Sequence, residues 1–307
     1  MPRPRSVPPF GNLLLALTLL SAAVTTHAQD AIAPVGEVEL VQDGFTFTEG
    51  PAWDPETETL YFSDIPNKTI FKLSTDGEIT PFTTDSKHTN GILVTHDGRL
   101  LGCQMDGQLV EYDKKDASAT ALADKFAGRR FNAPNDLVMD ASGGVFFTDP
   151  LFRAPTPLPQ TVQSVYYVAA NGKVTRVTKD LPAPNGIGLS PDGSRLYVCP
   201  SRSAEMFVYE VRGGGQLSPP KVFCTVEQPA GQSDTGADGI VLDEKGNVYI
   251  TTHIGVQIFS PEGKQLGVVK FPEQPANVTF GGKDWKTMYV TARKGLYRVQ
   301  MPIAGLH

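Results

Sequence analysis

The chain contains 307 residues, of which 33 are acidic and 27 are lysine or arginine, so its formal net charge is −6. The basic residues are scattered along the sequence, which argues against a nucleic-acid partner because a polyanion is bound by a clustered basic face. The 30 glycines and 25 prolines are typical of a chain with many turns and short strands.

The first 28 residues have the pattern of a secretory signal peptide. Arg3 and Arg5 form a short positive region, and an apolar stretch from Leu13 to Val24 follows it. This stretch is too short to span a bilayer of about 30 Å, so we expect cleavage after Ala28, with a retained anchor as the alternative. The mature protein is therefore predicted to be exported, either periplasmic or secreted. Residues 29–307 are expected to form one domain without membrane contact.

Export permits disulfide bonds, but the mature sequence has only three cysteines, Cys103, Cys199 and Cys224. An odd and sparse set cannot form a stabilising disulfide framework. We expect three buried thiols that behave as small hydrophobic side chains, with a bridge between Cys199 and Cys224 as the alternative.

Short apolar runs recur along the chain at intervals of 40 to 52 residues. Each run contains an aromatic or aliphatic marker residue and usually follows a turn such as Asp97-Gly98. The markers are Tyr61, Leu101, Phe146, Tyr197, Tyr249 and Tyr289. A strand pattern with this period is typical of propeller blades, each a four-stranded sheet. Six repeats predict an all-β fold, a six-bladed β-propeller.

The two ends of the chain predict how the ring closes. The last repeat ends at Val299 with too little chain for a fourth strand, whereas Glu37 to Val41 precedes the first repeat and has no blade of its own. An N-terminal strand that completes the last blade removes the free sheet edges. The longest departure from the repeat, the proline-rich segment Leu151 to Thr161, is predicted to be a surface loop.

Polar residues occur at one phase of the repeat, eleven or twelve positions before each marker. All six are carboxylates or amides: Glu49, Asn90, Asn135, Asn185, Asp238 and Asn277. Residues of equal phase in every innermost strand meet near one mouth of a propeller channel. Such oxygen donors suit one divalent cation, Ca²⁺ first, with Mg²⁺, Mn²⁺ or Zn²⁺ as alternatives and zinc least favoured by the ligand types. The alternative interpretation is that Asn-Gly and Asp-Gly only form turns.

Six sequence strings around these positions occur in order, at blade spacing, over nearly the whole mature chain. They are Thr48-Glu49-Gly50-Pro51-Ala52-Trp53, Asn132-Ala133-Pro134-Asn135-Asp136-Leu137, Phe147-Thr148-Asp149-Pro150, Pro184-Asn185-Gly186-Ile187, Ala237-Asp238-Gly239 and Asn277-Val278-Thr279-Phe280-Gly281-Gly282. Together they resemble the SMP-30/gluconolactonase/LRE family of six-bladed, calcium-dependent lactonases, and the resemblance is greatest to its bacterial gluconolactonase branch.

The resemblance implies a role for each matching residue. The implied metal ligands are Glu49, Asn135, Asn185 and Asp238. The implied substrate contacts are Arg130, Asn90 and Asn277; for Arg130 the alternative is an ordinary solvated arginine, and for the two asparagines a turn or a strand cap. Asp238 is the candidate catalytic base, and the alternatives are Asp136, His88 and His253. The segment Leu151-Phe152-Arg153 departs from the turn that the family has at this position.

The implied activity is the hydrolysis of sugar lactones, such as glucono-1,5-lactone to gluconate. A bound cation polarises the carbonyl and a carboxylate assists the attack of water. The sequence lacks a GxSxG elbow, a P-loop and a dinucleotide fingerprint, which disfavours serine hydrolysis and nucleotide cofactors. A small-molecule lactone is the expected partner, and no protein partner is implied. The alternatives are another lactone or a phosphotriester at the same site, or a non-catalytic propeller that binds a ligand.

Overall fold

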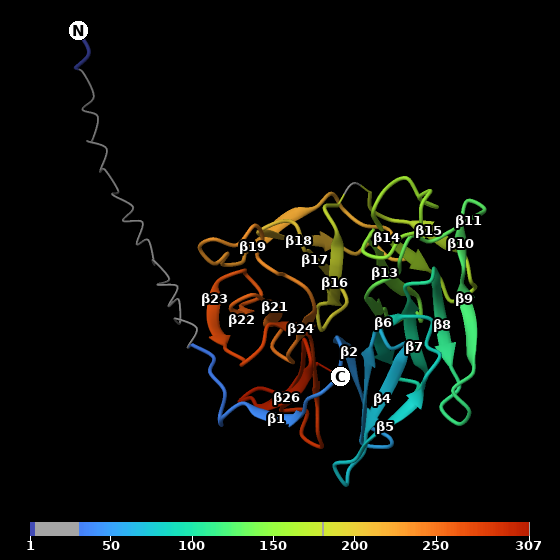
Figure 1. Cartoon of the computed structure of the whole chain (residues 1–307). Helices are drawn as coiled ribbons and strands as arrows, with labels where there is room; N and C mark the ends of the chain where they lie inside the picture. The colour runs from blue at the N-terminus through green and yellow to red at the C-terminus, as the bar shows by residue number, and fades with distance from the viewer. Residues whose placement is uncertain (4–30, 180, 307) are drawn as a thin grey trace.

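The computed structural model describes residues 1–3, 31–179 and 181–306, so nearly all of the predicted signal peptide lies outside the described residues. Six four-stranded antiparallel sheets and one two-stranded ribbon account for the 26 strands of this part of the chain, and it contains no helix. Accordingly, no helix among the described residues is long and apolar enough to cross a membrane. Figure 1 shows the sheets arranged around a central axis. The predicted six-bladed β-propeller is confirmed.

The innermost strand of each blade lines the central channel. Each of these strands contacts the innermost strands of both neighbouring blades, and the last lies beside the first, which closes the ring. In chain order they are β2 (Thr48–Asp54), β6 (Thr89–Val94), β12 (Leu137–Met139), β16 (Pro184–Leu189), β20 (Ile240–Leu242) and β24 (Pro275–Gly281).

The second strands carry the six marker residues and are buried on both faces because they pack between adjacent blades. They are β3 (Thr59–Asp64), β7 (Leu100–Gln104), β13 (Val145–Asp149), β17 (Arg195–Pro200), β21 (Val248–Thr252) and β25 (Thr287–Ala292). The third strands follow by short connections in most blades. They are β4 (Thr69–Leu73), β8 (Gln108–Tyr112), β14 (Ser164–Val168), β18 (Glu205–Glu210), β22 (Gly255–Phe259) and β26 (Gly295–Gln300).

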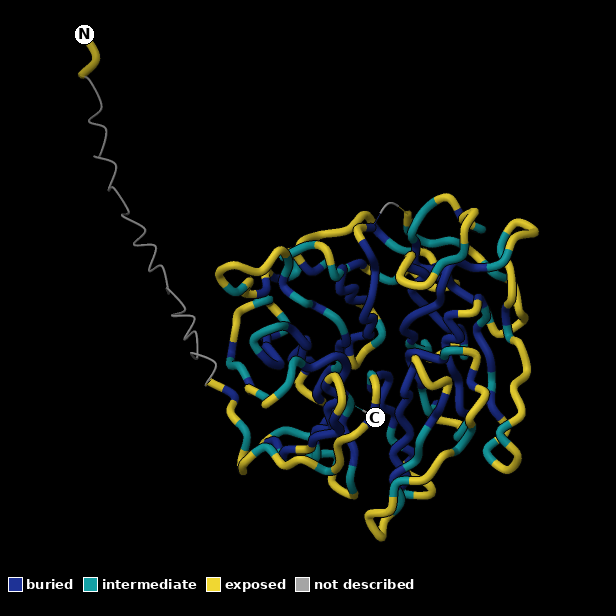
Figure 2. Tube along the Cα trace, in the orientation of Figure 1, coloured by how far each residue is buried: buried dark blue, intermediate teal, exposed yellow. Residues whose placement is uncertain are grey.

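The outer strands form the more exposed rim of the ring, as Figure 2 shows. They are β5 (Ile79–Thr83), β9 (Ala119–Ala123), β15 (Val174–Arg176), β19 (Lys221–Thr225), β23 (Gln265–Val269) and β1 (Glu39–Gln42). A small ribbon of β10 (Lys125–Phe126) and β11 (Arg129–Arg130) lies between the second and third blades in the chain.

The N-terminal strand completes the last blade, as the sequence predicts. Strand β1 pairs antiparallel with β26, with Glu39 opposite Arg298 and Leu40 opposite Tyr297. The strand begins two residues later than the predicted Glu37 and ends one residue later than Val41. Ile32 ahead of it packs into the hydrophobic core shared by the fifth and last blades, and its N–H donates to the carbonyl of Leu266 at 3.0 Å. The ring is therefore closed by both ends of the chain.

The two mouths of the channel are built differently. On one side, hairpin turns such as Asp97-Gly98 join the first and second strands, and Gly98 takes the left-handed φ of +81° that such turns require. The C-terminal segment crosses this side, where the backbone N–H of Leu306 donates to the carbonyl of Leu242 at 2.9 Å. The innermost strands begin at the opposite mouth, and the loops there carry the candidate site. Cys103, Cys199 and Cys224 are buried free thiols, as expected.

Candidate metal centre and active site

All six residues of the predicted polar ring lie at or just before the start of an innermost strand. Glu49, Asn90, Asn185 and Asn277 belong to β2, β6, β16 and β24, whereas Asn135 and Asp238 stand two residues before β12 and β20. Asp238 keeps partial exposure at the mouth, and the other five are at most 5% exposed. The repeat therefore brings the polar residues of all six blades to one mouth.

The glycines that follow these residues permit the innermost strands to approach one another. The N–H of Gly91 donates to the carbonyl of Asn135 at 2.7 Å, and the N–H of Gly186 donates to the carbonyl of Asp238 at 2.8 Å. A Cβ atom at Gly186 would lie 2.3 Å from that carbonyl oxygen. The alternative turn interpretation of Asn-Gly is therefore wrong for these two pairs, because their glycines serve backbone packing between blades.

Three carboxylates meet in this ring, since Asp136 joins Glu49 and Asp238. Burial raises the pKa of Asp136 to about 7. Burial also raises the pKa of Asp238 to about 7; a hydrogen bond with Asn185 acts against this rise and the charge of Asp136 adds to it. The pKa of Glu49 lies well above its usual range because of burial and then the negative charge of Asp238. Because these carboxylates raise one another's pKa values, a cation nearby would stabilise their ionised forms.

Several oxygen atoms of the ring are buried without a partner among the described residues. They include Asn90 Oδ1, Asn135 Oδ1 and Asp238 Oδ1. Nδ2 of Asn185 donates to Ser201 Oγ at 2.9 Å, which uses the amide nitrogen and leaves the carbonyl oxygen for a cation. Unpartnered buried oxygens are costly, and a hard cation would satisfy them. The described residues hold no cluster of three or more His, Cys, Asp and Glu side chains suited to a metal. A cation at the polar ring would therefore need amide oxygens among its ligands.

The folding stability of the metal-free protein is expected to depend on pH. In the metal-free folded protein Asp136 and Asp238 hold their protons up to about pH 7, whereas the unfolded chain releases them near pH 4. The folded state therefore binds more protons between these values, and its stability falls as pH rises through them. We expect the melting temperature of dialysed, metal-free protein to fall by several degrees between pH 5 and pH 8. Added Ca²⁺ should restore more of it at pH 8. Calorimetry that found the same calcium effect at both pH values would contradict this assignment.

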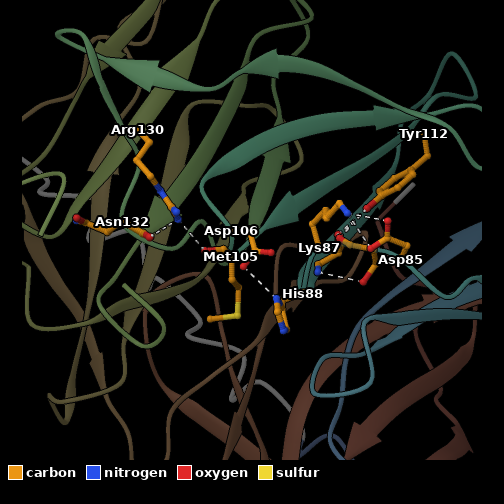
Figure 3. A network of polar contacts seen from close by, with 10 residues as sticks. Asp85, Lys87, His88, Met105, Asp106, Tyr112, Arg130 and Asn132 are labelled. Atoms are coloured by element: carbon orange, nitrogen blue, oxygen red, sulfur yellow. Dashed lines mark hydrogen bonds and ion pairs between the residues drawn. The ribbon is translucent and has the colours of Figure 1, made fainter. Parts of the chain in front are cut away.

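Arg130 has a different environment from the one the resemblance implies. Its Nε donates to the carbonyl of Phe131 at 3.0 Å, and its Nη2 donates to the carbonyls of Met105 and Asn132 at 3.3 and 3.2 Å (Figure 3). These bonds join the loop before β12 to the loop between β7 and β8. Arg130 therefore holds loops of the mouth together, and its contact with a substrate stays a prediction.

Asn277 also has a structural role. Its Oδ1 accepts a hydrogen bond from the N–H of Val278 at 2.8 Å. Its side chain is hydrogen-bonded to Glu49 and Asp136, which lowers the pKa of each against the larger effect of burial. Asn277 therefore orients two carboxylates of the ring. For Asn277 and Asn90, direct contact with a substrate stays a prediction.

Sequence reasoning did not assign two charged residues that belong to this site. Asp136 was considered only as an alternative base. Its position directly after Asn135 was the signal that could have placed it in the polar ring. The other is Arg293, whose positive charge lowers the pKa of Asp238. Cζ of Arg293 lies 5.3 Å from the centre of the Phe47 ring, and Nη2 of Arg293 donates a hydrogen bond to Gln274. No spacing rule could find it, because it lies in the loop between β25 and β26 and reaches the site only in the closed ring.

A cavity of about 800 Å³ occupies the channel on the other side of the ring. Asp136 and Asn277 lie at one end of it, and its wall is largely apolar, with Trp53, Leu137 and Val278 among the lining residues. The unpartnered oxygen atoms of the polar ring lie at the mouth where the innermost strands begin. The candidate cation site is therefore at that mouth and not in this cavity.

The loop from Leu151 to Thr161 lies between β13 and β14, at the same mouth as the ring. Gln160 anchors it, since its N–H donates to Asn132 Oδ1 at 3.0 Å and its Nε2 donates to the carbonyl of Arg130 at 3.1 Å. Leu151, Phe152 and Leu158 are exposed apolar residues. The loop is a surface loop, as predicted, and it forms one wall of the mouth.

The fold and the oxygen ring define a six-bladed β-propeller with a candidate cation site at one mouth of its channel. The model of the SMP-30/Gluconolactonase/LRE-like region matches residues 47–294, and the chain belongs to this family. A gluconolactonase of Zymomonas mobilis is 28% identical over 302 residues, covering 90% of this chain and 85% of that protein. An L-arabinolactonase of Azospirillum brasilense is 28% identical, covering 86% and 87%. The solved structure of a gluconolactonase from Xanthomonas campestris has a TM-score of 0.80 and 29% identity, covering 89% and 94%.

Proposed function

We propose that this protein is a divalent-cation-dependent lactone hydrolase, with glucono-1,5-lactone as its leading substrate and gluconate as the product. The observation that carries the proposal is the set of unpartnered buried oxygens of Asn90, Asn135 and Asp238 beside three carboxylates. Relatives that cover most of the chain and are named gluconolactonase and L-arabinolactonase support the choice of lactones. Ca²⁺ is the proposed ion because all the donors are oxygen atoms.

The proposed ligands are Glu49, Asn135, Asn185 and Asp238. A cation bound there would supply Lewis-acid polarisation of the lactone carbonyl and stabilise the oxyanion. Asp238 is the only one of the four that keeps exposure to the mouth, and a cation bound beside it would favour its ionised form. It would orient the attacking water and accept its proton. The positive charge of Arg293 lowers the pKa of Asp238 against the larger effect of burial, which favours the ionised carboxylate that this role needs.

We also propose that the protein is exported after cleavage behind Ala28. This rests on the positive and apolar regions at the start of the sequence. The substrate would then be met outside the cytoplasm, where millimolar Ca²⁺ suits a site of moderate affinity.

The test is lactone turnover by the purified mature chain with and without metal. We expect glucono-1,5-lactone to open faster than its spontaneous hydrolysis in the presence of Ca²⁺, measured as acid release at constant pH. Chelation should abolish the enzymatic rate, and added Ca²⁺ should restore it. Calorimetric binding of Ca²⁺ without any lactone turnover would instead identify a ligand-binding propeller.

A further inference from the structure

Six residues stand two positions before the members of the polar ring, and we call them the second layer. In order around the ring they are Phe47, His88, Ala133, Ala183, Gly236 and Pro275. Five of the six are apolar or small, and Ala133 and Ala183 are buried. His88 is the single ionisable residue of the layer, and its side chain is 13% exposed.

His88 stands beside other residues of the mouth. The N–H of Met105 donates to the carbonyl of His88 at 3.1 Å, and Figure 3 shows the His88 ring next to the Met105 side chain. Met105 in turn packs with Ala133, and Phe47 packs against the same cluster. Met105 thus contacts three adjacent members of the second layer, and His88 is the partly exposed one that can reach a ligand at the mouth.

Asp106 sets the orientation of the His88 imidazole. The distance between His88 Nδ1 and Asp106 Oδ1 is 3.0 Å, and a carboxylate can only accept there, so Nδ1 carries a proton. Among the described residues Nε2 has no hydrogen-bond partner, so it is available to a substrate. The other charged groups around the imidazole are Lys87 and Asp85 of its own loop and Arg130 of the neighbouring loop.

The backbone is strained where it presents His88. Lys87 and His88 are consecutive non-glycine residues in the left-handed region, with φ of 54° and 58°. Such residues carry a conformational cost and persist only where their surroundings hold them. A buried network does so here: Tyr112 Oη and Thr89 Oγ1 both hydrogen-bond to the carbonyl of Ser86, at 3.2 and 2.7 Å. Strain of this kind clusters at functional positions.

The protein has a second His–Asp pair, which differs in one respect. His253 Nε2 lies 2.9 Å from Asp234 Oδ1, in the fifth blade, opposite the second blade that carries His88. Its remaining nitrogen, Nδ1, lies against the backbone of Gly236, where an added Cβ atom would be only 2.7 Å away. The pair therefore holds the loop before β20, and His253 Nδ1 is not open to a ligand at the mouth.

The geometry points to His88 as the general acid that protonates the leaving ring oxygen of the lactone, with Asp106 as its positioning residue. This inference rests on the proposed function. Asp238 takes a proton from water as the water oxygen bonds to the carbonyl carbon. The bond from that carbon to the ring oxygen then breaks, and its electron pair stays on the oxygen. His88 takes part as the imidazolium, with Nδ1–H bonded to Asp106, and gives its Nε2 proton to this oxygen, which leaves a neutral imidazole. One water and one lactone give one hydroxy acid, and both side chains exchange protons with solvent to reset.

The test compares two leaving groups. An alkoxide is a far stronger base than a thiolate, so only the oxygen lactone needs an acid when its ring opens. Glucono-1,5-lactone and its 5-thio analogue are assayed with the wild type, His88→Gln and Asp106→Asn at saturating Ca²⁺. We expect His88→Gln to lower kcat on the oxygen lactone by about 10²-fold or more and on the thiolactone by less than about threefold. For Asp106→Asn we expect a fall of about tenfold on the oxygen lactone and an altered pH profile.

The matched control is His96→Gln, which removes a histidine from the turn between β6 and β7 at the other mouth, and it should keep both rates. Equal losses of His88→Gln on the two substrates, or no loss on either, would overturn the assignment. If His88→Gln does not fold, an unchanged ratio of the two rates in Asp106→Asn overturns it. If the wild type opens neither lactone, both the proposed function and this inference are refuted. If the wild type is active and His88→Gln is unaffected, only the inference is refuted.

Discussion

Replacement of Asp238 by asparagine is expected to lower lactone turnover by about 10² to 10⁴-fold, the usual loss when a general base is removed. An amide keeps one carbonyl oxygen for a cation, as Asn135 and Asn185 do, but it cannot take a proton from water. The substitution also removes one of three neighbouring carboxylates, so some loss of Ca²⁺ affinity is expected. Turnover should therefore fall much more than metal binding at millimolar calcium.

The measurement is kcat at saturating Ca²⁺ beside a calorimetric titration of the same variant. Asp192→Asn is the matched control, because it makes the same change in an exposed turn at the other mouth of the channel. It should keep the wild-type rate. If saturating Ca²⁺ restores the wild-type rate to Asp238→Asn, Asp238 is a ligand only, and Asp136 becomes the next candidate for the base.

Deletion of the N-terminal strand is expected to produce the largest loss of stability. A chain that begins at Gly44 lacks β1, which leaves the backbone edge of β26 unpaired and the last blade with three strands. It also lacks Ile32, a buried member of the core that the fifth and last blades share. Loss of the ladder and of this apolar burial should cost several kcal/mol, or about 10 °C in melting temperature for a chain of this size.

The comparison is a chain that begins at Gln29, which retains β1 and lacks only the predicted signal peptide. Glu39→Gln in that chain is a second control, since it removes the exposed ion pair with Arg298 and keeps the strand. Exposed pairs contribute about 0 to 1 kcal/mol, so this variant should melt close to its parent. Equal melting temperatures for the chains beginning at Gln29 and Gly44 would show that β1 is dispensable for ring closure.

The sequence by itself determined the architecture and the membership of the polar ring. Each blade repeats the same four strands, so a fixed offset along the chain becomes a fixed height in the channel. This is why Glu49 and Asn277, far apart in the sequence, could be assigned to one mouth without knowledge of any contact. The left-handed glycine turns and the closing N-terminal strand were equally readable, because turn chemistry and an unfilled blade are local or countable features.

The tertiary structure decided what each polar atom does. Arg130 Nε could serve a substrate or a backbone carbonyl, and only the packing of two loops shows that it binds the carbonyl of Phe131. His88 lies in the loop before β6, and Asp106 lies in the loop after β7. The two residues meet because both loops lie at the same mouth of the channel. Burial raises the pKa of Asp136 and leaves Asn135 Oδ1 without a partner, and burial is a property of the closed ring. A periodic sequence specifies height and angular position around a propeller, whereas hydrogen-bond pairing depends on side-chain rotamers and on loops that do not repeat.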